Sequence, residues 1–139
     1  MREHLDWVWT LAARHTGGDG VAWNLRIKNG WKPVLMFVKP PLNAWWGFFS
    51  DWISGGKEKD AHDWQQSLAE AEHFIRALCP AGGIVLDPMM GSGTAGVAAV
   101  KLGRQFIGIE CDSGTFAAAQ ERIEEVGQDE VGGGGCQAS

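Results

Sequence analysis

The segment from residue 84 to residue 110 constrains the fold more than any other part of the chain. Residues 84–86 (I-V-L) form a β-branched apolar run that is typical of a strand. They lead through a loop at 87–93 (D-P-M-M-G-S-G) into a helix of small residues at 94–102, and a second strand is expected at 106–110 (F-I-G-I-E). Because parallel strands are joined by a helical crossover, this order with short connections predicts a βαβ unit and the α/β fold class.

A further helix is expected on each side of this unit. Upstream, Ser67 and Glu70 match the capping box S-x-x-E, and apolar residues follow at helical spacing. Downstream, apolar residues recur at helical spacing over 116–126. Residues 127–139 contain four consecutive glycines and are expected to be a disordered tail.

The first 61 residues form a segment of different composition. All eight tryptophans of the chain lie between Trp7 and Trp64, and there is no tyrosine. The sequence therefore predicts three parts, an aromatic-rich segment at 1–61, the βαβ unit with its flanking helices at 62–126, and the tail. The elements expected in the first part are a helix at 4–15, a strand at 21–27, a turn at Asn29-Gly30, a strand at 33–38 buried on both faces, and a loop at 42–61.

Charge and cysteine usage exclude several classes of protein. The chain has 12 Lys and Arg against 17 Asp and Glu, a net charge of −5, which excludes a strongly basic nucleic-acid-binding protein. Cys79, Cys111 and Cys136 have no metal-ligand spacing, as in a reduced intracellular chain, and no metal site is expected. No apolar run approaches the roughly 18 residues of a membrane span. The sequence thus predicts a cytoplasmic protein without a membrane partner.

The glycine loop has the features of a site for an adenosine-containing cofactor. Gly91 and Gly93 let a ligand approach the backbone, and the helix that follows offers free N–H groups at its start. Glu110 follows Gly91 by 19 residues, where an acid in such a unit accepts hydrogen bonds from both ribose hydroxyls. A tight turn beside an incidental acid is the alternative.

The type of cofactor can be narrowed from the same residues. Residues 91–96 (G-S-G-T-A-G) match the dinucleotide fingerprint G-x-G-x-x-G. However, the Asp87 carboxylate would repel a pyrophosphate, and the 29 residues after Glu110 are too few for the rest of a dinucleotide fold. A cofactor with a sulfonium or amino group suits the acid better, so a fragment of an NAD-dependent oxidoreductase is the least favoured interpretation.

Four segments resemble one family. The run V-L-D-P-M-M-G-S-G-T-A-G-V-A-A-V-K-L-G-R-Q-F-I-G-I-E at 85–110 resembles the S-adenosylmethionine-binding segment of the amino-directed DNA methyltransferases, which modify adenine N-6 or cytosine N-4. H-D-W-Q-Q-S at 62–67 resembles the motif that precedes it in circularly permuted members, and F-x-x-A-x-x-R-I at 116–123 resembles their next helix. Residues 31–39 resemble an earlier strand less specifically, so the resemblance is firm only over 62–123.

The resemblance implies a partial Rossmann-like methyltransferase fold, S-adenosylmethionine as the cofactor and DNA as the substrate. The cofactor residues that it implies are Asp87, Pro88, Gly91, Ser92, Gly93, Thr94 and Glu110, and, near the methionine end, Trp64, Gln65, Gln66 and Ser67. Ser67 has an equally good interpretation as a helix cap, and the alternative for Thr94 is that it simply opens its helix.

No catalytic residue can be assigned. The family's catalytic motif, an acid or Asn before two prolines and an aromatic, accepts protons from the target amino group and stacks the flipped base. Lys39-Pro40-Pro41-Leu42 has the prolines but a cation in the acceptor's place. In the permuted order this motif precedes the segments found here, so the resemblance implies the C-terminal portion of such an enzyme.

Two interpretations of the function stay open. The chain is either a DNA methyltransferase homologue that is inactive alone because the catalytic motif is absent, or a non-catalytic S-adenosylmethionine-binding or partner subunit whose site is completed by a second chain that supplies the motif. Trp45, Trp46 and Trp52 are correspondingly either platforms that stack bases or anchors that pack on a missing part of the fold.

Overall fold

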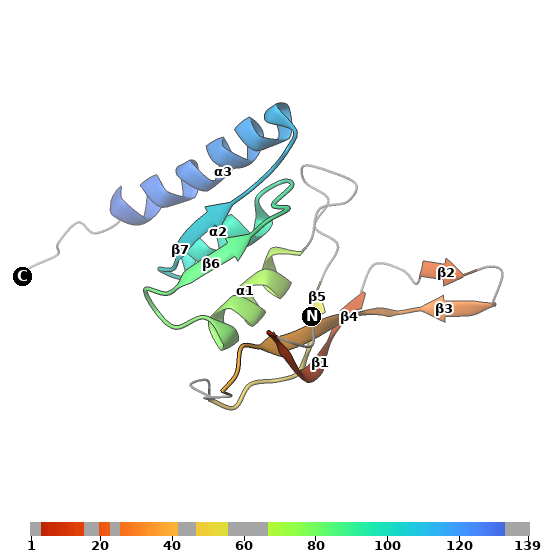
Figure 1. The fold of residues 1–139 in the computed structure, drawn as a ribbon. Coiled ribbons are helices and arrows are strands. Elements are labelled where there is room, and N and C mark those ends of the chain that lie inside the picture. Colours follow the sequence, from red (N-terminus) through yellow and green to blue (C-terminus); the bar gives the residue numbers. More distant parts are fainter. Residues whose placement is uncertain (1–3, 16–19, 23–25, 42–46, 56–66, 133–139) are drawn as a thin grey trace, which may run out of the picture. The chain divides into compact units, whose positions relative to one another are not determined.

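The computed structural model describes residues 4–15, 20–22, 26–41, 47–55 and 67–132. The chain divides into two compact units, Met1–Lys57 and Glu58–Ser139, which are coloured red to yellow and green to blue in Figure 1. The division falls a few residues before the end of the aromatic-rich segment expected from the sequence. Each unit is described by itself.

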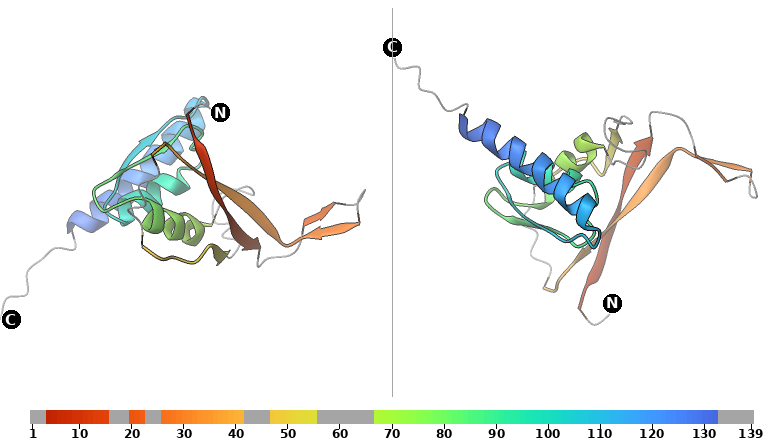
Figure 2. Two further views of the ribbon diagram at one scale, coloured as in Figure 1. Left: turned by 60° about the horizontal axis from the view of Figure 1, so that its bottom comes forward. Right: turned by 90° about the horizontal axis from the view of Figure 1, so that it is seen from above.

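The first unit is built on a three-stranded sheet with the strand order β4-β1-β5. The central strand, β1 (Asp6–His15), pairs antiparallel with β4 (Trp31–Val38) and parallel with β5 (Trp52–Gly55). Figure 2 shows β1 and β4 side by side as two long arrows. Before β4, the short strands β2 (Gly20–Ala22) and β3 (Ile27–Asn29) form an antiparallel pair of their own.

The prediction of a helix at 4–15 is wrong, because this segment forms strand β1. Its apolar residues have a spacing that also fits a helix, but the segment pairs with β4 from Asp6 to Arg14. Pairing with a distant strand overrides a weak local preference. Leu11 and Ala13 on this strand are almost completely buried, with 1% and 0% exposure.

Three further expectations for the first unit are corrected. Asn29-Gly30 is not a hairpin turn, since β3 pairs back to β2 and the chain continues through Gly30 into β4. Strand β4 forms as expected, but its burial alternates along the strand, so only the face that includes Met36 is buried. The segment 42–61, expected to be a loop, contains strand β5.

The opposite face of this sheet is apolar and exposed. Trp31, Leu35 and Phe37 alternate along β4 and therefore share one face. Pairing adds Trp7 of β1 to the same face, and Trp52 of β5 lies opposite Ala12, which pairs with Pro33. The five large side chains are between 38% and 59% exposed. Trp45 and Trp46 lie outside the described residues.

The second unit has a parallel pair of strands, β6 (Ile84–Asp87) and β7 (Gln105–Gly108), joined by helix α2 (Thr94–Lys101). Helix α2 packs against both strands and lies between α1 (Leu68–Leu78) and α3 (Ser113–Gly132), as Figure 1 shows. The βαβ unit and the α/β fold class expected from the sequence are confirmed.

Close packing of α2 on one face of the strands depends on Gly96. A Cβ atom at Gly96 would lie 2.7 Å from Cε1 of Phe106 on β7 and in contact with Ile123 of α3. The other face of the two strands is open, since Ile84 and Leu86 of β6 are 58% and 61% exposed. Ile107 and Ile109 continue this exposed apolar face along β7 and just beyond it.

The ends of two elements differ from expectation. Helix α3 continues to Gly132, so residues 127–132 are helical where the sequence predicted a tail, and residues 133–139 lie outside the described residues. Strand β7 ends at Gly108, which places Glu110 in the connection to α3 rather than on the strand. In the described parts of the chain, no helix is both long and apolar enough to span a bilayer.

Candidate functional site

The connection between β6 and α2 is a tight loop fixed by its own hydrogen bonds. The Asp87 carboxylate accepts a hydrogen bond from the Met89 amide at 3.0 Å, and the Gly93 amide donates to the Met90 carbonyl at 2.9 Å. Gly91 and Gly93 have φ values of 51° and 75°, in the left-handed region that favours glycine. The two glycines are therefore required by the backbone of the loop.

Glu110 closes this loop from the connection between β7 and α3. Its Oε2 accepts a hydrogen bond from the Gly91 amide at 3.0 Å. Its Oε1 accepts from the amides of Cys111 at 2.8 Å and Asp112 at 3.1 Å, and from the Cys111 thiol at 3.4 Å. The Asp112 amide is the largest cause of a lowered Glu110 pKa, followed by the Cys111 thiol and, more weakly, the Gly91 and Cys111 amides; partial desolvation opposes them. Glu110 is thus held as a carboxylate, and Oε2 keeps capacity to accept another hydrogen bond.

The loop borders a pocket of about 210 Å³ at the start of α2. The first hydrogen bond within this helix runs from the Val97 amide to the Gly93 carbonyl at 2.9 Å, so the amides of residues 94–96 have no acceptor within the helix. A Cβ atom at Gly91 would meet no atom within 4 Å, which leaves that side of the loop open. The residues that line the pocket are Asp87, Met89, Met90, Gly91, Ser92, Thr94 and Ala95.

Helix α3 packs against the β6–α2 loop at Ser92 and Gly93. Nη1 of Arg122 donates to the Ser92 carbonyl at 2.9 Å and lies 3.4 Å from Oγ1 of Thr94, which is buried. A Cβ atom at Gly93 would lie 3.1 Å from both Cβ of Ala119 and Cδ1 of Ile123 on the same helix. Arg122 was not among the site residues expected from the sequence, although it lies in the segment 116–123 that carries the resemblance. Arg122 is one of the four specified residues of the pattern F-x-x-A-x-x-R-I, and this is the signal in the sequence that could have singled it out.

The structure brings five of the eleven expected cofactor residues together at this pocket. Asp87, Gly91, Ser92 and Thr94 line the pocket, and Glu110 is bonded to its rim. Gly93 faces α3 instead, while Pro88 is exposed in the turn and is not among the lining residues. Trp64, Gln65 and Gln66 lie outside the described residues.

Ser67 does not cap helix α1 in the expected way. It occupies the N-cap position, but its side chain makes no capping hydrogen bond, so this part of the capping-box prediction is wrong. The residue is 6% exposed, and its Oγ has no hydrogen-bond partner among the described residues. Buried hydroxyl groups are usually hydrogen-bonded, which makes this orphaned atom notable.

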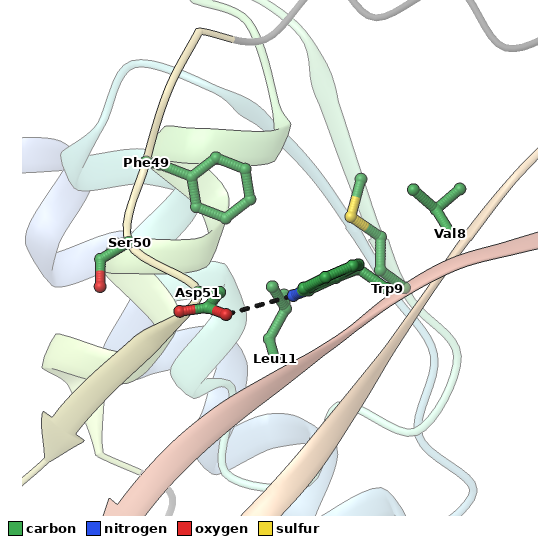
Figure 3. Close-up of a pocket in the computed structure, with 7 residues that line it drawn as sticks. Val8, Trp9, Leu11, Phe49, Ser50 and Asp51 are labelled. Atoms are coloured by element: carbon green, nitrogen blue, oxygen red, sulfur yellow. Dashed lines mark hydrogen bonds between the residues drawn. The ribbon is translucent and has the colours of Figure 1, made fainter.

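The first unit has a pocket of its own, of about 390 Å³ (Figure 3). The indole Nε1 of Trp9 donates to Oδ2 of Asp51 at 3.2 Å across it, and Leu11 and Phe49 contribute apolar walls. The Lys39-Pro40-Pro41 sequence follows β4 and is exposed. Across the described segments of both units, no group of acidic, His and Cys side chains has the arrangement of a metal site.

Comparison with known proteins identifies the family. The model of the DNA methylase family matches residues 3–121. The type II methyltransferase M.ScaI of Streptomyces caespitosus is 36% identical over 105 residues, which are 73% of this chain and 34% of that protein. M2.DpnII of Streptococcus pneumoniae is 41% identical over 63 residues, 45% of this chain and 24% of that protein. The crystal structure of the M1.HpyAVI–SAM complex aligns with a TM-score of 0.69 at 28% identity, over 88% of this chain and 64% of that chain.

These matches extend the resemblance seen in the sequence. The family model begins at residue 3 and so includes the first unit, whereas the motifs were firm only from residue 62. The chain spans about a third of the length of M.ScaI and less than two thirds of M1.HpyAVI. On the extent of the family match and the identity to M.ScaI, this chain belongs to the DNA methylase family.

Proposed function

We propose that this chain binds S-adenosylmethionine at the β6–α2 loop and forms the cofactor-binding part of a DNA methyltransferase. The acceptor of the methyl group would be an exocyclic amino group of adenine or cytosine. The observation that carries the proposal is the bond between the Gly91 amide and the Glu110 carboxylate, which joins the glycine loop to an acid placed for a ribose. Its relative M1.HpyAVI was solved as a complex with SAM, which supports the same cofactor here.

The residues around the pocket suit this cofactor. The free acceptor capacity at Oε2 of Glu110 would receive a ribose hydroxyl, and the open side of Gly91 would let the ligand reach the backbone. Oδ2 of Asp87 has no hydrogen-bond partner among the described residues, so its charge is available to the cationic methionine part of the ligand. S-adenosylmethionine, when bound, supplies an electrophilic methyl group.

Methyl transfer also requires an acceptor for the protons of the target amino group. In this chain Lys39 precedes the two prolines, and a cation cannot accept those protons. We therefore propose that a second polypeptide supplies the acid-Pro-Pro-aromatic motif and that DNA is the substrate of the pair. The same observation favours the second candidate, a non-catalytic S-adenosylmethionine-binding subunit.

Isothermal titration calorimetry on the full chain tests cofactor binding. S-adenosylmethionine and its demethylated product should each bind at one site per chain, and NAD should not bind because Asp87 repels a pyrophosphate. Binding of NAD without binding of S-adenosylmethionine would exclude the proposal.

A methyl-transfer assay tests the need for a second polypeptide. The chain alone, saturated with labelled S-adenosylmethionine, should transfer no label to unmethylated DNA under conditions in which M.ScaI does. Transfer by the chain alone would show that it has a catalytic acceptor of its own, and would reject both the split site and the non-catalytic subunit.

A further inference from the structure

Arg122 of α3 makes its hydrogen bonds with residues outside its own helix. Among the described residues, its guanidinium bonds only to the Ser92 carbonyl of the β6–α2 loop (2.9 Å) and to the Thr94 hydroxyl at the start of α2 (3.4 Å). Glu125 stands three residues further along α3, at ion-pair spacing, yet among the described residues Arg122 forms no ion pair. The Arg122 side chain is half-buried, so its guanidinium loses part of its hydration when it makes these two contacts.

The other described Lys and Arg residues of the second unit have ordinary roles. Arg76 and Lys101 lie in the last turns of α1 and α2, where a positive charge favours the helix dipole. Arg104 donates to the Cys79 and Leu102 carbonyls, where α1 and α2 end. Arg122 is the one described cation of this unit that bonds near the N-terminus of α2, where a positive charge is electrostatically unfavourable. A favourable interaction with the dipole of α2 therefore does not explain why the Arg122 guanidinium lies at this end of the helix.

We propose that Arg122 is a positioning residue for the cofactor loop, an inference that rests on the proposed binding of S-adenosylmethionine there. By holding the Ser92 carbonyl, the guanidinium fixes the peptide plane between Ser92 and Gly93. The N–H of that same peptide donates to the Met90 carbonyl, and Gly93, with φ at 75°, is the N-cap of α2. One side chain thus sets the path of the loop without entering the pocket, since Arg122 is not among the lining residues.

The position of the Thr94 hydroxyl strengthens this argument. Oγ1 of Thr94 is 3.4 Å from both Nη1 of Arg122 and Oγ of Ser92, so the three groups form a chain from α3 to the pocket lining. Holding the lining residues in the bound arrangement lowers the ordering entropy that the ligand would otherwise have to offset. Replacement of Arg122 should therefore have a larger effect on the Kd for S-adenosylmethionine than on the stability of the folded chain.

Matched substitutions in the full chain test the proposal. Arg122→Met removes the donors and keeps much of the side-chain length, while Arg104→Met is the same change at carbonyls away from the loop. We expect Arg122→Met to raise the Kd for S-adenosylmethionine about tenfold, as for a lost bond to a charged group. Arg104→Met should lower Tm but leave Kd within about twofold of the wild type. An unchanged Kd in Arg122→Met, or an equal rise in both variants, overturns the proposal.

Two further measurements keep the test decisive. If Arg122→Met does not fold, Arg122→Lys replaces it, because a single ammonium retains the charge but not the fixed fork; we expect Kd to rise about threefold, and a wild-type Kd rejects the role. Hydrogen exchange without ligand should be faster at the Gly91 and Gly93 amides in the Arg122 variant than in Arg104→Met. If the wild type binds no S-adenosylmethionine, the proposed function fails, and exchange alone decides whether Arg122 positions the loop.

Discussion

The Gly91 amide and the Glu110 carboxylate are 3.0 Å apart although the two residues are 19 positions apart in the chain. The intervening residues form helix α2 and strand β7, so this bond closes the βαβ unit at the carboxyl ends of its two strands. Ligands of open α/β sheets bind at that edge. The shape of the glycine loop and the orientation of the acid are therefore set together.

Replacing Glu110 by Gln should weaken S-adenosylmethionine binding about hundredfold, because charge-assisted hydrogen bonds to the ribose are lost. The NH2 group of Gln also takes the place of one carboxylate oxygen, where it faces either the Gly91 amide or the Cys111 amide, and both of these are donors themselves. Calorimetry measures the change in Kd. Glu121→Gln, an exposed position on α3, is the control with the same charge change and should bind as the wild type does.

Two glycine substitutions should separate binding from folding. Gly96→Ala places a Cβ 2.7 Å from Phe106 and should lower the free energy of unfolding by about 1–3 kcal/mol in urea titrations. Gly91→Ala meets no atom within 4 Å and should lower it by only about 1 kcal/mol, through its φ of 51°. Because its new methyl group stands at the pocket, Gly91→Ala should raise Kd about tenfold. An unaltered Kd would place the ligand elsewhere.

Ser67→Ala tests whether the orphaned hydroxyl belongs to the cofactor site. Without ligand the change should leave Tm unchanged or slightly higher, because Oγ has no partner to lose among the described residues. With ligand, the loss of one hydrogen bond should raise Kd about fivefold. A lower Tm with an unchanged Kd would instead assign Ser67 to the start of α1.

The lowered pKa of Glu110 predicts a loss of stability in acid. A carboxyl group whose pKa is lower in the folded chain contributes its full stability above its ordinary pKa of 4.5, and loses that contribution as pH falls through the lowered folded value. The free energy of unfolding should therefore decline below about pH 4.5. The decline should be less steep in Glu110→Gln, which has no carboxyl group to protonate, and an identical decline in both chains would show that the Glu110 bonds do not persist in solution.

The Cys111 thiol should report on the occupied site. It is exposed and lies 3.4 Å from Oε1 of Glu110, so a ligand bound to this carboxylate would shield it. At S-adenosylmethionine concentrations ten times Kd, alkylation of Cys111 by N-ethylmaleimide should slow about tenfold. Mass spectrometry of peptides follows each cysteine separately, and half-buried Cys79 should react at the same rate with and without ligand.

The second unit was predictable because its signals are local. Strand, glycine loop, helix and strand follow one another within residues 84–110, and each connection is short. The first unit was not, because the identity of β1 depends on pairs such as Trp7 with Phe37, thirty positions apart. Strand pairing over such distances leaves no trace in local spacing.

The candidate site shows the same limit on a smaller scale. Glu110 could be found because a parallel strand returns to the same edge of the sheet, which fixes its distance from Gly91 in the sequence. Arg122 reaches the Ser92 carbonyl across thirty residues, and only the packing of α3 brings them together. The sequence of α3 indicates a helix but not which of its polar side chains points to the loop.

The exposed side of β6 and β7 has a thermodynamic consequence. Parallel strands are normally covered on both faces, whereas Ile84, Leu86, Ile107 and Ile109 present more than half of each side chain to water. Any molecule that covers these four side chains only in the folded chain shifts the folding equilibrium towards the native state by mass action. The melting temperature of this chain should therefore depend on which molecules in the solution bind this face and on their concentration.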